Sequence, residues 1–218
     1  MKNYLFKLGK KGKKASIEIV KTKKKDKVLS DYCNLILKNQ LKIISENKKD
    51  LEKAKKQKLK ENLIKRLSID KGKLLQIINS IKMIIKLKDP VNITLNKWKR
   101  PSGLKIKKVT TSIGVIAVIY ESRPNVTSDV ATLCFKSGNP VILKGGSEAY
   151  YSNKILTDLF QKALQKNNVS KNYVQFINLK TCVVFPLFII THRSLEHAFP
   201  INGVFTGWFD FSGNKSEC

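Results

Sequence analysis

Two short stretches of the sequence carry residue types that could bind an anionic ligand, and each follows an apolar run. In "VILKGGSEA" the run ends in lysine and a small polar turn follows, made of Lys144, Gly145, Gly146, Ser147 and Glu148. Glycines let a backbone approach a ligand closely, and N–H groups at a helix start favour a phosphate or a ribose hydroxyl. The stretch could therefore bind a nucleotide. It matches neither a Gly-x-Gly-x-x-Gly fingerprint nor a Walker loop, so the alternative is a tight turn without a ligand.

The second stretch, "YESRPNVTSD", combines a guanidinium and an amide around a stiffening proline. Arg123 could clamp a phosphate or a carboxylate with paired hydrogen bonds. The side-chain amide of Asn125 could donate to an oxyanion that develops during a reaction. The alternative is a solvated loop that precedes a helix, with Thr127 or Ser128 as its N-cap.

Residues 112–180 contain the elements that must position both stretches. Three apolar runs rich in β-branched residues predict buried strands at Ile113–Tyr120, Pro140–Lys144 and Tyr173–Leu179. Helical patterns lie between these runs, so the order strand, helix, strand, helix, strand predicts a parallel βαβαβ sheet. Ligands of such sheets gather beyond the carboxyl ends of the strands, where both stretches lie.

The two connecting helices have expected faces and ends. The first should bury Val126, Val130 and Leu133 and end at Gly138, which suits the left-handed residue after a helix. The second should begin with Ser147 as its N-cap. Its expected buried face consists of Tyr151, Ile155, Leu159 and Ala163.

The remaining residues divide by composition. Residues 1–88 are predicted to be helical, because two sets of apolar residues recur at helical spacing: Leu29, Cys33, Leu37, Leu41 and Ile44, and then Leu74, Ile77, Ile78, Ile81, Ile84 and Ile85. Residues 89–111 form a hairpin-like connection around "PSG". Residues 181–218 are poor in basic residues and rich in phenylalanine, which marks a boundary near residue 180.

The formal net charge of +27 suggests nucleic acid or an anionic surface as a partner. The basic residues are 39 lysines and four arginines, whereas nucleic-acid readers depend on arginine, so we interpret the charge as a solvated surface. The four cysteines include no Cys-x-x-Cys pair, so no metal site is expected. The longest apolar run, "CVVFPLFII", is too short to span a bilayer, and a cytoplasmic protein without a membrane segment is predicted.

The stretch "SIGVIAVIYESRPNVTSDVATLCFKSGNPVILKGGSEAYYSNKIL" resembles the γ-glutamyl phosphate reductase (glutamate-5-semialdehyde dehydrogenase) family of the aldehyde dehydrogenase superfamily. The pieces "ENKKDLEKAKK", "LKDPVN" and "WKRPSGLKIKKV" follow the family's order, and the resemblance runs from about Leu8 to Leu179. It implies an α/β fold: N-terminal helices followed by a partial Rossmann-like parallel βαβαβ sheet, an incomplete aldehyde dehydrogenase fold. Residues 112–180 would then be a partial NADP-binding unit.

The resemblance also implies an activity. The family reduces L-glutamyl 5-phosphate with NADPH to L-glutamate 5-semialdehyde in proline biosynthesis, through a cysteine thiolate that attacks the acyl phosphate. Lys144 and the turn from Gly145 to Glu148 would contact the adenosine side of NADPH. Asn125 would be the oxyanion donor, and Arg123 would bind anionic groups of the substrate. The full-length family member is expected to be a homo-oligomer.

Residues 181–218 resemble nothing in that family, and we interpret them as out of frame. Cys33, Cys134, Cys182 and Cys218 do not fall where the resemblance requires the nucleophile, so the catalytic cysteine is expected to be absent and the chain inactive alone. Two other hypotheses stay open. One is a basic module that binds nucleic acid or an anionic surface without enzymatic activity. The other is a subunit that is completed by a separately encoded catalytic half.

Overall fold

The computed structural model describes residues 2–18, 20–178 and 197–201. Its helices are α1 (Lys2–Ser16), α2 (Thr22–Lys38), α3 (Gln40–Lys56), α4 (Glu61–Leu67), α5 (Lys71–Lys86), α6 (Pro124–Lys136) and α7 (Tyr150–Lys166). Short 3₁₀ turns, η1 (Ser147–Ala149) and η2 (Lys171–Tyr173), flank α7. The strands are β1 (Thr94–Lys99), β2 (Lys105–Val109), β3 (Ile116–Tyr120), β4 (Val141–Gly145), β5 (Val174–Phe176) and β6 (His197–Ile201).

The main sheet is parallel, with the strand order β5-β4-β3-β6. The predicted three-stranded parallel arrangement of β3, β4 and β5 is confirmed, and β6 adds a fourth strand whose backbone pairs with β3. The third strand is shorter than predicted, and Leu179 lies outside the described residues. The expectation for residues 181–218 also lies outside them, apart from the backbone of β6.

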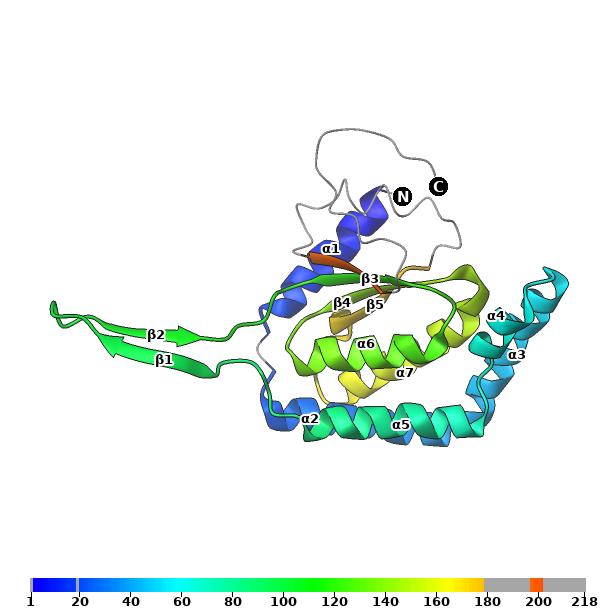
Figure 1. The fold of residues 1–218 in the computed structure, drawn as a ribbon, viewed down its shortest axis with the longest axis horizontal. Coiled ribbons are helices and arrows are strands. Elements are labelled where there is room, and N and C mark those ends of the chain that lie inside the picture. The colour runs from blue at the N-terminus through cyan, green and yellow to red at the C-terminus, as the bar shows by residue number, and fades with distance from the viewer. Residues whose placement is uncertain (1, 19, 179–196, 202–218) are drawn as a thin grey trace.

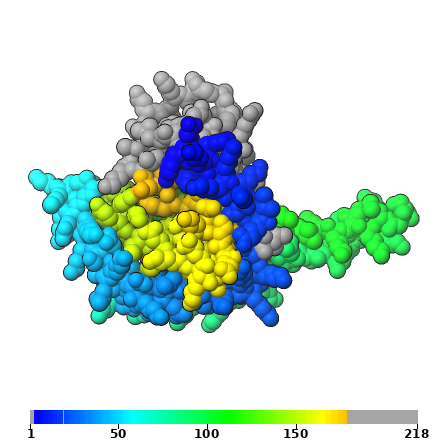
Figure 2. All heavy atoms as spheres, turned by 180° about the vertical axis from the view of Figure 1, so that it is seen from behind, coloured from blue at the N-terminus to red at the C-terminus, as the bar shows by residue number. Residues whose placement is uncertain are grey.

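Side chains of β3 and β4 alternate between two apolar clusters, so both faces of the sheet are buried. Val118 and Leu143 join the main core, which α2, α5, α6 and α7 also supply. Ala117 and Ile142 point to the opposite face, where Leu5 of α1 packs on them. Figure 1 shows α6 and α7 against one face of the sheet with α2 and α5 beyond them, and Figure 2 shows α1 in dark blue on the other side.

Local sequence explains where the helices near the sheet begin and end. Pro124 occupies the first turn of α6, where its fixed φ and missing N–H are tolerated. This start lies before Thr127 and Ser128, so neither of them is the N-cap that we considered. Gly138 follows the helix with φ +74°, as predicted. The side chain of Asp70 caps α5 by accepting a hydrogen bond from Lys73 N at 2.7 Å.

Three apolar positions singled out in the sequence lie outside the core. Leu37 and Leu41 are exposed because α2 ends at Lys38 and α3 begins at Gln40, so the apolar stripe does not continue across Asn39. Leu133 is 49% exposed because α6 instead packs Val130, Ala131 and Phe135 into the core. The stripe of α5 from Leu74 to Ile84 is buried as predicted.

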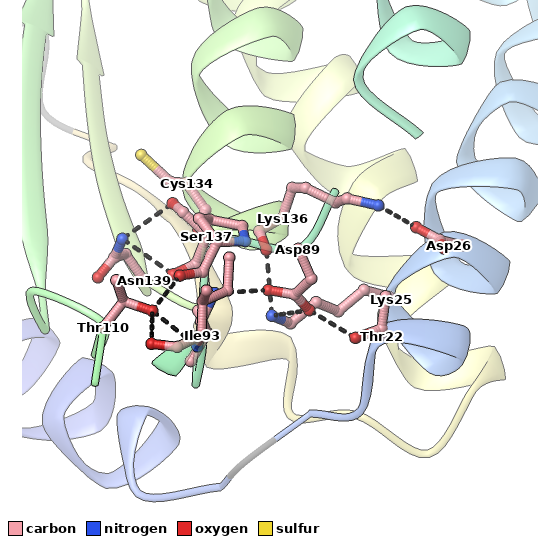
Figure 3. A network of polar contacts seen from close by, with 12 residues as sticks. Thr22, Lys25, Asp26, Asp89, Ile93, Thr110, Cys134, Lys136, Ser137 and Asn139 are labelled. Atoms are coloured by element: carbon pink, nitrogen blue, oxygen red, sulfur yellow. Dashed lines mark hydrogen bonds and ion pairs between the residues drawn. The ribbon is translucent and has the colours of Figure 1, made fainter. Parts of the chain in front are cut away.

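A polar network joins the start of α2 to the end of α6 and to the base of the hairpin (Figure 3). Lys25 is 2% exposed and donates to Asp89 Oδ2 at 2.8 Å and to the carbonyl of Lys136 at 3.1 Å. Lys136 is 3% exposed and donates to Asp26 Oδ1 at 2.5 Å. Buried ammonium groups require such partners, so this network holds α2 to α6 and to the segment before the hairpin.

The predicted hairpin is confirmed as the antiparallel pair of β1 and β2. It projects away from the remaining body (Figures 1 and 2), and no residue of either strand is fully buried. Its exposed apolar side chains include Leu95, Trp98 and Val109. No helix in the described part of the chain is long and apolar enough to cross a membrane.

Candidate functional site

The carboxyl ends of β3 and β4 bring the two stretches singled out in the sequence together. Tyr120 and Gly145 are paired in the sheet, so the loop after β3 and the turn after β4 are neighbours. Ser122 Oγ donates to Glu148 Oε2 at 2.6 Å, which ties the loop to the turn. The local cause is the register of two parallel strands that end at the same edge.

Two pockets flank the loop after β3. The first, which we call the α5–α6 pocket, has a volume of about 550 Å³, and its lining comes from the end of α4, from α5 and from the start of α6: Lys65, Arg66, Ser68, Ile69, Lys73, Gln76, Ile77, Ser80, Arg123, Pro124, Asn125 and Asp129. The second, the turn pocket, has a volume of about 420 Å³ and is lined by Leu59, Leu63, Arg66, Leu67, Glu121, Ser122, Arg123, Gly146 and Glu148. Both volumes suit a small molecule or part of a larger one.

Arg66 and Arg123 line both pockets. Arg123 is the N-cap residue of α6, and its Nε is buried without a hydrogen-bond partner in the described part of the chain. Arg66 lies in the last turn of α4, and within the described ranges its side chain makes no hydrogen bond or ion pair. A buried guanidinium nitrogen without a partner is costly unless a ligand completes it. The pair is therefore placed to bind an anion.

Asn125 is exposed in the first turn of α6 and lines the α5–α6 pocket. Its Nδ2 donates to Asp129 Oδ2 over 3.5 Å, one helical turn along. The other oxygen, Asp129 Oδ1, is buried and has no partner among the described residues. Burial raises the pKa of Asp129, and the hydrogen bond from Asn125 offsets only part of that rise.

The two glycines of the turn are required by the protein itself. A Cβ on Gly145 would lie 2.2 Å from Asn153 Nδ2, and one on Gly146 would lie 2.6 Å from Ser122 Oγ. Gly146 has φ −56°, so the requirement there is space and not a left-handed backbone. Close packing therefore requires the Gly-Gly pair whether or not a ligand binds at the turn.

Glu148 and Lys144 occupy different surroundings. Glu148 lines the turn pocket; burial raises its pKa, but hydrogen bonds from Ser122, from its own backbone and from Ser147 outweigh this, so the net pKa is below the usual range. Glu148 is thus held as a carboxylate. Lys144 is half-buried, its Nζ donates to the carbonyl of Gly145 at 3.2 Å, and it is not part of the described lining of either pocket.

Two N–H groups in the first turn of α7 are held by a carboxylate of the protein. Asp50 of α3 accepts hydrogen bonds from Tyr151 N at 3.1 Å and from Ser152 N at 2.8 Å. Ser147 is not the N-cap of α7, because it belongs to η1 and its hydroxyl donates to Glu148 Oε1 at 3.0 Å. An anion therefore cannot use the N–H groups of Tyr151 and Ser152 while Asp50 holds them.

The described cysteines are placed for packing. Cys33 lies in the main core, where burial raises its pKa. Cys134 packs against that core from α6, and burial raises its pKa to about 12. A thiol that stays protonated is a poor nucleophile. Cys182 and Cys218 lie outside the described residues.

Arg66, Asp129 and Asp50 belong to no motif that predicts a functional or capping role from the sequence. Arginine is rare in this lysine-rich chain, so the type of Arg66 was a usable signal. No local pattern distinguished Asp129 or Asp50, because their neighbours in the site come from distant parts of the sequence.

The chain is similar in sequence to γ-glutamyl phosphate reductases. A γ-glutamyl phosphate reductase of Nitratiruptor is 44% identical over 170 residues, which are 77% of this chain and 41% of the relative. One of Sulfurihydrogenibium is 43% identical over 157 residues, 72% of this chain and 35% of the relative. The chain therefore spans less than half the length of these relatives. No family model matches it.

Solved structures show the same similarity. The crystal structure of γ-glutamyl phosphate reductase from Thermotoga maritima matches with a TM-score of 0.88 and 32% identity over 91% of this chain and 49% of that one. A probable aldehyde dehydrogenase from Listeria monocytogenes matches with a TM-score of 0.67 and 13% identity over 90% of this chain and 41% of that one, which supports the fold alone. The chain is therefore a homologue of γ-glutamyl phosphate reductase that corresponds to less than half of that protein and has part of the aldehyde dehydrogenase fold.

Proposed function

We propose that this chain forms part of the substrate and cofactor cleft of a γ-glutamyl phosphate reductase. The whole enzyme would reduce L-glutamyl 5-phosphate with NADPH to L-glutamate 5-semialdehyde in proline biosynthesis. One observation carries the proposal: Arg66 and Arg123 line two adjoining pockets at the carboxyl ends of β3 and β4. The homology with γ-glutamyl phosphate reductases supports this reaction.

Within this proposal the cofactor lies on the turn after β4. The residues assigned to it are Lys144, Gly145, Gly146, Ser147 and Glu148. Glu148 is a carboxylate at the wall of the turn pocket and could accept a hydrogen bond from a ribose hydroxyl. Gly146 lines the same pocket, whereas the N–H groups of Tyr151 and Ser152 are held by Asp50. The homology supports a nicotinamide cofactor, and NADPH is our specific proposal.

Arg123 and Asn125 are assigned to the substrate. Arg123 would bind an anionic group, since its buried Nε has no partner among the described residues. Asn125 would donate its amide to the oxyanion that forms when a thiolate attacks the acyl phosphate. Its present contact with Asp129 is long and exposed, so the amide can reorient at little cost. The thiolate would come from a cysteine other than Cys33 or Cys134, whose raised pKa values disfavour that form.

A titration with NADPH tests the cofactor assignment. We expect weak binding by the 218-residue chain, further weakened in Lys144→Ala, and no NADPH-dependent reduction of L-glutamyl 5-phosphate. Tight binding that Lys144→Ala leaves unchanged would place the cofactor elsewhere. Turnover that is abolished by Cys182→Ser or Cys218→Ser would refute the expected inactivity.

The alternative of a nucleic-acid-binding module is not favoured by the homology. A salt titration of binding to duplex DNA and to RNA separates it from the proposed enzyme, because phosphate contacts weaken steeply with salt. We expect only weak binding that salt removes and that shows no sequence preference. The predicted cytoplasmic location stays a prediction.

We also propose that the complete protein is a homo-oligomer and that the hairpin of β1 and β2 takes part in the contact. Isolated two-stranded hairpins are marginal in water, and this one exposes Leu95, Trp98 and Val109. Exposed apolar side chains on a projecting arm are typical of an interface. The third hypothesis, a separately encoded catalytic half, requires an interface as well and is tested by co-expression with such a half.

A further inference from the structure

The α5–α6 pocket is lined by charged side chains of both signs. Its described lining includes several cationic side chains but a single carboxylate, Asp129. That carboxylate forms no ion pair with Arg66 or Arg123, although all three line the same pocket. Lys73 is engaged elsewhere, because its ammonium donates to the carbonyls of Lys65 and Ser68 at 2.8 and 2.6 Å.

Asp129 is poorly satisfied by the protein. Its Oδ1 is buried without a partner in the described part of the chain, and its Oδ2 has only the 3.5 Å contact with Asn125. Burial raises its pKa, so its charged form gains from any cation that reaches it. The side chain thus lacks a positively charged donor, and the pocket beside it has room for one.

Arg66 and Arg123 can bind the opposite charge, a carboxylate on the same ligand. Guanidinium groups bind planar carboxylates with paired hydrogen bonds, which lysine cannot reproduce. Two of only four arginines in a chain with 39 lysines line this pocket. A ligand that binds both the arginines and Asp129 must carry a carboxylate and an ammonium close together. An amino acid carries both groups on its α-carbon.

We propose that the α5–α6 pocket binds the α-amino-acid end of the substrate, with Arg66 and Arg123 on the α-carboxylate and Asp129 on the α-ammonium. This inference rests on the proposed function for the identity of the substrate. Ile69 and Ile77 supply apolar wall for the methylene groups between the two ends of the ligand. Asp129 would then make the site select amino acids over dicarboxylates that lack the ammonium.

The test compares L-glutamate with glutarate, which has the same carbon skeleton and no amino group. Each is titrated into the ¹⁵N-labelled 218-residue chain at about physiological salt, and binding is followed by amide shifts of residues around the pocket. Glutarate carries the larger negative charge, so attraction by the basic surface favours glutarate. We expect the opposite order, with L-glutamate bound at least about tenfold more tightly.

Variants test whether Asp129 causes the preference for L-glutamate over glutarate. Asp129→Asn should remove the preference for L-glutamate and leave glutarate binding unchanged or stronger. Asp158→Asn is the matched control, since the side chain of Asp158 on α7 is 45% exposed and its ion pair within the described residues is with Lys154. It should retain the wild-type preference. Arg66→Lys keeps the charge without the fork and should weaken both ligands.

Several outcomes would overturn the inference. Equal binding of the two ligands by the wild-type chain would do so, as would the absence of pocket shifts with saturating L-glutamate. If Asp129→Asn moves the side-chain amide resonance of Asn125 but keeps the preference, Asp129 only orients Asn125. The wild-type comparison decides the question even if Asp129→Asn does not fold.

A parallel titration with NADPH separates this inference from the proposed function. Shifts at Gly146 and Glu148 with NADPH, combined with equal binding of L-glutamate and glutarate, would refute the amino-acid site and leave the cofactor assignment intact. Preference for L-glutamate without any NADPH shift would support the amino-acid site and count against the cofactor assignment.

Discussion

Replacement of Asp50 by alanine should destabilise the chain strongly, because this carboxylate caps α7 from another helix. It is fully buried and accepts hydrogen bonds from Tyr151 N, Ser152 N and Ser152 Oγ at 3.1, 2.8 and 2.6 Å. Loss of a cap typically costs about 0.5–2 kcal/mol. The buried groups of Ser152 would also lose a partner, at roughly 1–3 kcal/mol. Since Tyr151 is half-buried and water can reach it, we expect a total loss of about 2–4 kcal/mol.

The effect should extend to the site, because Asp50 belongs to a buried network that also holds the chain after α4. Asn47 donates to the carbonyl of Leu67 at 2.9 Å and to Ser152 Oγ at 3.0 Å, and it accepts from Ile69 N at 2.8 Å. Loss of Asp50 therefore loosens the end of α4, which carries Arg66. Burial raises the pKa of Asp50 despite the hydrogen bonds it accepts, so Asp50→Asn, which keeps an acceptor and removes the charge, should cost less than Asp50→Ala.

Urea unfolding followed by circular dichroism measures this loss. The matched control is Asp158→Ala on the same helix, where an exposed pair with Lys154 is worth at most about 0.5 kcal/mol. A shift in the unfolding midpoint at constant slope would show a change in stability alone. If Asp50→Ala costs no more than Asp158→Ala, the cross-helix cap does not stabilise the fold.

Three further predictions follow from particular contacts. Gly145→Ala should destabilise by roughly 1–3 kcal/mol in urea unfolding, because its Cβ would lie 2.2 Å from Asn153 Nδ2; an unchanged midpoint would contradict the packing requirement. Hydrogen bonds from Lys166 and then Asn167 lower the pKa of Asp31 below its usual 3.8, so its contribution to stability is present above that value and lost as pH falls through the lower folded-state pKa. Thermal unfolding between about pH 5 and pH 2 should therefore show a shallower decline in Asp31→Asn than in wild type, and parallel declines would refute the assignment. Trp98→Ala should shift any self-association of the chain toward monomer in sedimentation velocity without lowering its Tm, and an unchanged distribution would exclude Trp98 from the contact.

The sequence alone determined the elements whose pattern is local. Continuous β-branched runs predicted β3 and β4, and the apolar stripe from Leu74 to Ile84 predicted α5. The order of strands and helices predicted a parallel sheet, and Gly138 predicted a helix end. These features follow from periodicity and backbone preference, which neighbours along the chain express.

Only the tertiary structure decided what each functional residue contacts. The apolar pattern suggested that Leu133 packs in the core, but the orientation of α6 exposes it. Local sequence left the N–H groups at the start of α7 available to a ligand, whereas Asp50, about a hundred residues earlier, accepts two of them. Asp129 and Arg66 share a pocket although they lie on different helices. Such relations depend on contacts between segments far apart in the sequence, and periodicity within one segment carries no information about them.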